Sequence, residues 1–281
     1  MVKLSTNRYG KSLVRLVKVI RNGSSHDMLE WSVEVTVEGD FETCFTEGDN
    51  SKILPTDTMK NTVYSLARCS NATCIEEFGK ELAGYLLANN PQIESVRVEI
   101  AQKLWERIVT AGQVHQTAFQ QTGPEVWTTA VNVSHASGTI IQSGIKGLMI
   151  LKTAGSAFVG YIKDKLTTLP ETTDRLLCTE ATISWTYSKA DLSFLELRRV
   201  VTNTLLEVFA KRESPSVQHT IYAMGQAVLI GVPDVSEIDI LMPNRHCLLI
   251  NLSPFGQDNP NEIFVPTDEP HGTIQAKLVR E

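Results

Sequence analysis

The chain has 281 residues, a formal net charge of −6, and 42% apolar and 21% charged side chains, as is typical of a soluble globular protein with a buried core. This composition excludes a disordered chain, a collagen and a coiled-coil rod. The longest apolar runs, such as Ala227–Val232, have about six residues, far fewer than the roughly 20 that a membrane-spanning helix needs.

The distribution of charge and the cysteine content indicate which classes of binding partner and which compartment to expect. Residues 1–135 carry 13 basic and 16 acidic side chains, and residues 136–281 carry the same numbers. Because neither half is basic, we expect neither nucleic acid nor a membrane as a partner, and a small molecule is the better expectation. The five cysteines are odd in number and widely scattered, which indicates a reducing compartment without a disulfide framework. The N-terminus has no apolar stretch, so we expect no secretory signal.

The first half of the chain predicts two strands, a helical region and two further strands. Residues 12–21 and 31–38 are expected to be strands around the turn signal Asn22–Ser25, and residues 31–38 alternate between apolar and polar side chains. A capping box formed by Thr73 and Glu76 predicts a helix that begins at Thr73. Residues 94–109 and about 125–133 return to strand, and residues 110–125 predict an irregular exposed hairpin loop. The apolar stripe of the helix comprises Ile75, Phe78, Leu82 and Leu86.

The second half repeats this plan. Strands are expected at 139–151 and 179–187, followed by a helix from Ser193 with a capping box through Glu196. A second helix is predicted from near Ser214 to Gly231, because Pro215 suits a first helical turn and Pro233 lies just beyond the end. Strands near 235–242 and 246–253 close this half. The apolar stripe of the first helix comprises Leu197, Val201, Leu205 and Val208.

Each half therefore reads as strand, strand, helix, helix, strand, strand. Sequential strands joined by turns predict an α+β fold, with antiparallel sheets and helices on one face. We place the domain boundary between residues 135 and 136, giving domains 1–135 and 136–281. The uncovered sheet face is expected to keep apolar side chains, which predicts an oligomer.

Motifs for cofactors and metals are missing from the sequence. There is no GxGxxG, HExxH or GxSxG. Gly155 and Gly160 have the spacing of a phosphate-binding loop, but Tyr161 stands where the lysine should be. Cys69 and Cys74 lack a second pair of metal ligands. We therefore expect no metal and no cofactor.

Several short segments carry polar residues that suit a binding site. Each of them alone is more typical of a structural role: a solvated lysine, a capped turn, a buried phenylalanine, a surface arginine, a solvated glutamine or a structural histidine. Taken together and in this order, they resemble urate oxidase (uricase). The matching stretches are RYGK at 8–11, TDTMKNTVY at 56–64, TTLPETTDRLL at 167–177, SVQ at 216–218, PNRH at 243–246 and FVPTDEPHG at 264–272.

The resemblance implies a fold and an assembly. Uricases have the tunnelling fold (T-fold), with two tandem ββααββ domains per subunit, and they form homotetramers around a central tunnel with active sites at subunit interfaces. One subunit would supply Lys11 and Thr56, and its neighbour the remaining residues. The C-terminus lacks the peroxisomal tripeptide of many eukaryotic uricases, so we expect a cytoplasmic protein.

The resemblance also assigns roles to residues. Lys11, Thr56 and His246 match catalytic residues that relay protons. Arg175 and Gln218 match the residues that clamp the purine, and Phe158 the ring that stacks on it. Further matches are the backbone amides of Asp57 and Val217, which contact the purine, Asn244, which holds dioxygen, and Leu169, which forms an apolar wall.

These residue types suit the implied reaction, in which urate, O2 and H2O give 5-hydroxyisourate and H2O2 without a cofactor. Urate is a flat anion, so a guanidinium fork can grip its edge and an aromatic ring can hold its plane. A partly desolvated lysine can act as a base, and a threonine hydroxyl can pass the proton. Two alternatives stay open: a pterin-binding enzyme of the same fold, and a purine-binding T-fold protein without oxidase activity.

Overall fold

The computed structural model describes residues 2–281 and divides into two compact units. The first unit comprises the residues up to Gly144 together with Thr186–Glu196, and the second comprises Ile145–Trp185 and Leu197–Glu281. Each unit pairs a sheet with helices. The domain boundary at residues 135 and 136 remains a prediction.

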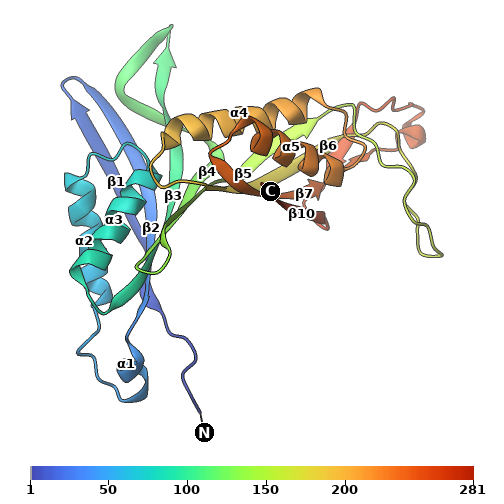
Figure 1. Cartoon of the computed structure of the whole chain (residues 1–281). Helices are drawn as coiled ribbons and strands as arrows, with labels where there is room; N and C mark the ends of the chain where they lie inside the picture. Colours follow the sequence, from blue (N-terminus) through green and yellow to red (C-terminus); the bar gives the residue numbers. More distant parts are fainter. Residues whose placement is uncertain (1) are drawn as a thin grey trace. The chain divides into compact units, whose positions relative to one another are not determined.

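The first unit is a sheet with its strands in chain order. The order is β1-β2-β3-β4-β5, and β1 to β4 pair antiparallel. Helices α2 and α3 lie on the same side of this sheet (Figure 1). The strands are β1 (Tyr9–Asn22), β2 (Ser25–Gly39), β3 (Ile93–Thr110), β4 (Gln113–Ser134) and the start of β5 (Gly138–Lys152), and the helices are α1 (Glu42–Thr46), α2 (Thr56–Cys69) and α3 (Ile75–Asn89).

The core of the first unit lies between this sheet and its helices. All four apolar residues of the alternating stretch in β2, Trp31, Val33, Val35 and Val37, are buried, as is the whole predicted stripe of α3. A Cβ atom on Gly79 of α3 would lie 2.8 Å from the Val131 side chain of β4. The helix therefore packs closely on the sheet because this position carries no side chain.

The opposite face of this sheet is mixed in character. It carries polar side chains, among them Glu34, Thr36 and Arg97, which line a hollow of about 460 Å³. On β1 it also carries the exposed apolar side chains of Val17 and Val19, which pair with β2 on the face opposite the core. The predicted apolar side chains of the uncovered face are therefore present on β1, whereas the centre of this face is polar.

Two local predictions in the first unit are wrong in whole or in part. The capping residue of α3 is Cys74, and the Thr73 amide and hydroxyl donate to the carboxylate of Glu77 instead, at 2.9 and 3.2 Å. Glu76 cannot complete a capping box because it is buried and accepts a hydrogen bond from Ser143. Residues 110–125 belong to an exposed hairpin, as predicted, but they are strand and turn rather than an irregular loop, since β3 and β4 pair, with two register shifts, up to a tight turn at residues 111–112.

The second unit repeats the arrangement with the strand order β5-β6-β7-β10. A Cβ atom on Gly225 of α5 would lie 3.0 Å from Leu278 of β10 and 3.3 Å from Ile238 of β7, so α5 packs closely on these strands. The elements are the end of β5, most of β6 (Leu177–Tyr187) and α4 (Phe194–Lys211), α5 (Val217–Gly231), β7 (Val235–Arg245), β8 (Cys247–Leu249), a 3-10 turn (Ser253–Phe255), β9 (Phe264–Pro266) and β10 (Gly272–Val279).

Two boundaries in the second unit differ from the prediction. The strand expected at 246–253 shrinks to β8, which pairs only with β9, and the last strand of the sheet is β10. Helix α5 begins at Val217 rather than near Ser214, because the Ser216 hydroxyl accepts from the His219 amide and caps the helix. The order strand, strand, helix, helix, strand, strand is confirmed in both halves.

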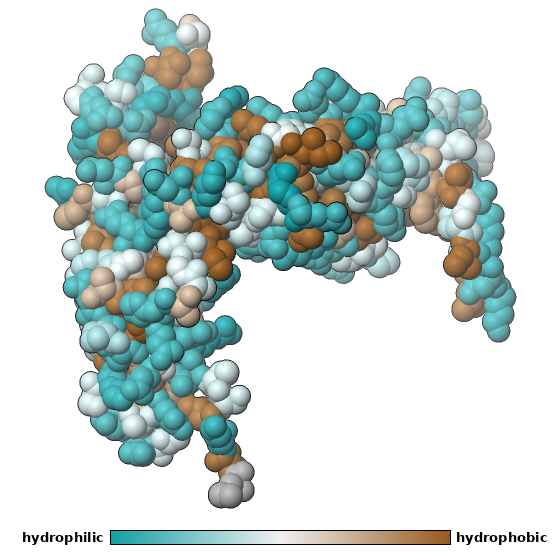
Figure 2. Space-filling view, in the orientation of Figure 1, coloured by the Kyte–Doolittle hydropathy of each residue, from teal (hydrophilic) through white to brown (hydrophobic). Residues whose placement is uncertain are grey.

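The surface is mainly hydrophilic. On the face seen in Figure 2, apolar residues form small separate groups among polar ones. Among residues 2–281, no helix has the length and apolar character needed to cross a bilayer.

Candidate active site

The structure brings Lys11, Thr56 and Asp57 together in the first unit; we call these three the relay group. Lys11 on β1 lies opposite Val35, whose side chain is buried on the helix-covered face, and cross-strand partners share a face. Thr56 and Asp57 are the first two residues of α2, which contacts β1. The hydrogen bond and charge of Lys60 lower the pKa of Asp57, and the nearby charge of Lys11 lowers it further.

Local features of β1 aim Lys11 at this position. A Cβ atom on Gly10 would lie 1.9 Å from the carbonyl oxygen of Val35, so only glycine allows the two strands to approach so closely. A bulge follows between Lys11 and Val14, where Leu13 has a positive φ of 56°. Bulges of this kind re-aim side chains.

The relay group has unused hydrogen-bonding capacity. Helix α2 has no side-chain cap, and its first amide to bond within the helix is that of Met59, which donates to Pro55 at 3.1 Å. The amides of Thr56 and Asp57 precede it, so they are free to bind another group. Among residues 2–281, Lys11 Nζ makes no hydrogen bond and no ion pair.

Phe158 and Arg175 lie together in the second unit; with Val217 and Gln218 they form what we call the clamp group. The guanidinium carbon of Arg175 lies 5.3 Å from the centre of the Phe158 ring. Backbone hydrogen bonds hold both residues, since Phe158 exchanges two bonds with Thr172 and the Arg175 amide donates to Ser156 at 2.8 Å. The loop therefore fixes an aromatic face beside a cation.

Arg175 is poised to bind an anion. Its side chain is half-buried, burial lowers the pKa of its guanidinium, and its Nε atom is buried without a hydrogen-bond partner among residues 2–281. A buried unpaired donor of a charged group is costly. A ligand with an acceptor at this position would satisfy it.

The start of α5 joins the same loop. The Ala157 amide donates to the Ser214 carbonyl at 2.7 Å, and the Ser214 amide donates to Gly155 at 2.8 Å. A buried hydrogen bond from Thr220 to Ser214, of 2.7 Å, ties this junction to the helix. Val217 and exposed Gln218 follow directly as the first residues of α5, so the predicted clamp residues lie on connected segments.

Asn244 and His246 lie at the end of β7. Asn244 pairs with Gly272 of β10, and the His246 carbonyl accepts from the amide and hydroxyl of Thr267, at 2.8 and 3.1 Å. Arg245 between them forms ion pairs with Glu180 and, at 3.2 Å, with Asp268. Among residues 2–281, no hydrogen bond joins Asn244 or His246 to the clamp group.

Two supporting residues were missed by the sequence analysis. Tyr161 stacks on Phe158, with ring centres 4.8 Å apart, and its hydroxyl donates to the carbonyl of Leu169, the predicted wall residue, which is itself exposed. Arg245 lies inside the PNRH stretch, but nothing in the pattern identified its acidic partners. Both act through contacts that only the folded chain creates.

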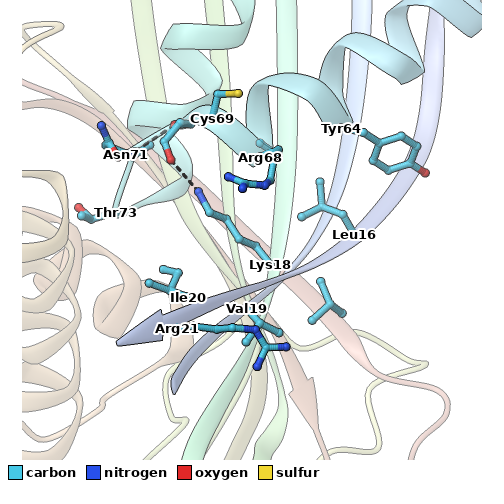
Figure 3. Close-up of a pocket in the computed structure, with 14 residues that line it drawn as sticks. Leu16, Lys18, Val19, Ile20, Arg21, Tyr64, Arg68, Cys69, Asn71 and Thr73 are labelled. Atoms are coloured by element: carbon cyan, nitrogen blue, oxygen red, sulfur yellow. Dashed lines mark hydrogen bonds between the residues drawn. The ribbon is translucent and has the colours of Figure 1, made fainter. Parts of the chain in front are cut away.

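A separate groove of about 870 Å³ lies between β1 and the end of α2 in the first unit (Figure 3). It contains none of the predicted site residues. Two of its cations lie at the helix end: Lys18 donates to the carbonyl of Ser70 at 2.7 Å, and Arg68 lies in the last turn of α2. Cations are favourable at a helix C-terminus, so this groove has a structural explanation.

The part of the chain that the structure describes, residues 2–281, contains no group of three or more His, Cys, Asp or Glu side chains arranged to hold a metal ion. The predicted site residues thus lie in separate groups: the relay group belongs to the first unit, and the clamp group, Asn244 and His246 belong to the second.

Known proteins resemble this chain over almost its whole length. The family model described as Uricase matches residues 7–132 and 141–275. A uricase from Arthrobacter globiformis is 41% identical over 280 residues, covering 100% of this chain and 91% of that protein. Uricase-2 isozyme 2 of Glycine max is 39% identical, covering 97% and 94%.

Solved structures agree with these matches. The crystal structure of the Arthrobacter globiformis uricase matches with a TM-score of 0.95 and covers 100% of this chain and 96% of that one. A uricase from Bacillus fastidious matches with a TM-score of 0.83 at 26% identity, covering 98% and 94%. The predicted tunnelling fold is therefore confirmed.

Proposed function

Since the chain belongs to the uricase family and its function is the oxidation of urate, we propose that it carries out this reaction without a metal or an organic cofactor. Urate, O2 and H2O would give 5-hydroxyisourate and H2O2. The observation that carries this proposal is the pairing of Arg175 with Phe158. The guanidinium, whose buried Nε atom has no hydrogen-bond partner among residues 2–281, lies beside the face of an aromatic ring. That combination suits a flat anion.

The clamp group binds urate in this proposal. The guanidinium of Arg175 donates to one edge of the purine with charge assistance. Gln218 offers both a donor and an acceptor to an adjacent amide edge, and the free amide of Val217 adds a donor at the positive end of α5. Phe158 stacks on the ring, and Leu169 provides an apolar wall. The opposite face of urate is left open to dioxygen.

The relay group moves protons. The Nζ atom of Lys11 makes no hydrogen bond and no ion pair among residues 2–281. Lys11 lies on the covered face of the sheet near the start of α2. Lys11 accepts a proton from urate through the Thr56 hydroxyl, and the amide of Asp57 holds the purine. His246 orients the relay, and Asn244 pins first dioxygen and then water. The deprotonated urate is itself the reductant that passes electrons to O2.

We propose that the active protein is a homotetramer, as its membership of the uricase family implies. Active sites at subunit interfaces would combine Lys11 and Thr56 of one subunit with the clamp group of its neighbour. The active site would then be complete only in the assembly. We also place the protein in the cytoplasm.

The test is the decay of urate absorbance by purified protein, run with and without a chelator and with peroxide measured in parallel. We expect equal rates in both samples and one peroxide for each urate consumed. A strict need for added metal would overturn the cofactor-free reaction.

The same assay distinguishes a urate oxidase from the alternative of a purine-binding protein without oxidase activity. A purine-binding protein without oxidase activity would bind urate in an equilibrium measurement but produce no peroxide. That result would leave the clamp group intact and reject the role of the relay group.

A further inference from the structure

Tyr9 is a residue of the RYGK stretch to which the reaction assigns no task. It lies on β1, two positions before Lys11, and pairs with Val37 of β2. Residues two apart on a strand share a face, so the side chains of Tyr9 and Lys11 both lie on the helix-covered side. Tyr9 is thus placed to act on the same region as the relay group.

The hydroxyl of Tyr9 forms a long-range contact with the segment that leads into α2. It accepts a hydrogen bond of 2.8 Å from the backbone amide of Leu54, 45 positions away in the sequence. Leu54 precedes Thr56 by only two residues, and Pro55, which lies between them, restricts the backbone. This hydrogen bond therefore connects the strand that carries Lys11 with the turn that carries Thr56.

The ring of Tyr9 is held in place by packing. It packs edge-on against Phe41, with ring centres 4.9 Å apart and an interplanar angle of 78°, and Phe41 is fully buried. Burial raises the pKa of the Tyr9 hydroxyl, although the hydrogen bond from Leu54 opposes this. The hydroxyl therefore stays protonated and serves as a neutral acceptor across the physiological pH range.

We propose that Tyr9 is a positioning residue that sets the separation between Lys11 and Thr56. This inference rests on the proposed function, in which these two residues exchange a proton. Proton transfer depends steeply on geometry, and a displacement of about 1 Å can lower the rate on the order of a hundredfold. A single well-anchored hydrogen bond between the two segments is enough to control such a displacement.

The substitution Tyr9→Phe tests this proposal, because it removes the acceptor and keeps the ring that packs on Phe41. We expect kcat to fall about tenfold, while urate binding measured without oxygen stays within about twofold. The pH profile of kcat should also shift, since the relay geometry changes. The control is Tyr85→Phe, which removes an exposed tyrosine hydroxyl on α3 and should leave kcat, binding and the pH profile unchanged.

A double substitution tests whether Tyr9 affects kcat through Lys11. If Tyr9 acts through the relay, Tyr9→Phe should have no further effect on kcat in a Lys11→Met background. Independent, multiplicative losses in the two backgrounds would overturn the proposal, as would an unchanged kcat in Tyr9→Phe alone.

Hydrogen exchange of the Leu54 amide tests the Tyr9 contact independently of urate oxidation. Protection of the Leu54 amide should fall in Tyr9→Phe whether or not the protein oxidises urate, and unchanged protection would overturn the contact itself. If the unmodified protein does not oxidise urate, the proposed function fails, and the loss of Leu54 protection still reports the hydrogen bond.

Discussion

The relay group and the clamp group rest on different kinds of support. Lys11 and Thr56 lie on a paired strand and at the start of a packed helix, beside a core that includes fully buried Val35 and Met59. Phe158 and Arg175 lie on the long connection between β5 and β6, which contains no helix and only isolated bridges. Backbone hydrogen bonds, and not a packed core, hold this connection in place.

This difference matches the role proposed for each group. Proton transfer needs precise distances, which a strand and a helix joined by a core supply. Binding of a flat substrate tolerates small adjustments, and a cross-linked loop allows the substrate to enter. We therefore expect Lys11 and Thr56 to control turnover mainly, and Phe158 and Arg175 to control affinity.

The largest effect should come from Lys11→Met, which replaces the proposed base with an apolar side chain of similar length. Because a proton-transfer group acts mainly in the transition state, kcat should fall about 10²–10⁴-fold. Urate affinity measured without oxygen should change by less than about threefold. Steady-state kinetics and anaerobic equilibrium binding provide the two measurements.

Lys18→Met is the matched control on the same strand. Lys18 donates to the carbonyl of Ser70 at the end of α2, so its loss should lower thermal stability without changing kcat per folded molecule. Equal losses of kcat and affinity in Lys11→Met would mean that Lys11 binds urate and does not relay protons.

The next largest effect should come from Arg175→Ala in the clamp group. Loss of a charge-assisted hydrogen bond should weaken urate binding by about 2–3 kcal/mol, or roughly 30–150-fold. Lys165→Ala removes an exposed cation from the same loop and should change affinity by less than about twofold. Affinity that falls equally in both variants would point to the net charge of the loop instead of a specific clamp.

The sequence predicted the regular elements well because their signals are local. The alternation in β2 and the apolar stripe of α3 correspond directly to buried faces. Helix starts were less accurate, since Cys74 caps α3 without a side-chain hydrogen bond and Glu76 is drawn into the core by Ser143. Strand β10 was missed because its identity depends on pairing with β7, a contact between distant parts of the chain.

The candidate site was predictable only in part for the same reason. The relay and clamp residues were named because short stretches resemble those of a known family. Tyr9 and Arg245 were not, since they bond to partners 45 and 65 positions away, Leu54 and Glu180. Tyr161 was not, since its contacts with Phe158 and Leu169 depend on how an irregular loop folds. No local pattern records such contacts.

A pair of glycine substitutions tests the support of the relay group. Gly10→Ala would place a Cβ atom 1.9 Å from a backbone oxygen, so the strands must separate and stability should fall by about 1–3 kcal/mol. Gly84→Ala in α3 meets no atom within 4 Å and should stabilise the protein by about 0.5–1 kcal/mol. Denaturant unfolding measures both. Similar stability changes in the two variants would contradict a special role for Gly10.

The smallest effect concerns a hydrogen bond on the surface of the clamp loop. The Glu171 carboxylate accepts from the Gly160 amide at 3.0 Å and pairs with Lys163 at 3.1 Å, and these contacts lower its pKa. Because the pKa of Glu171 is lower in the folded protein than its ordinary value of about 4.5, the ionised carboxylate stabilises the loop fully at pH values above 4.5. This stabilisation is lost as the pH falls through the folded-state pKa.

We therefore expect Glu171→Gln to reduce the exchange protection of the Gly160 amide by about two- to fivefold near pH 6, a modest change because the group is exposed. As the pH falls, protection in the unmodified protein should approach that of the variant, after correction for the intrinsic exchange rate. Protection that stays constant with pH in the unmodified protein would show that the backbone bonds of Phe158 and Arg175 hold the loop without Glu171. The Leu54 amide of the first unit, which has a tyrosine acceptor, should keep its protection over the same pH range.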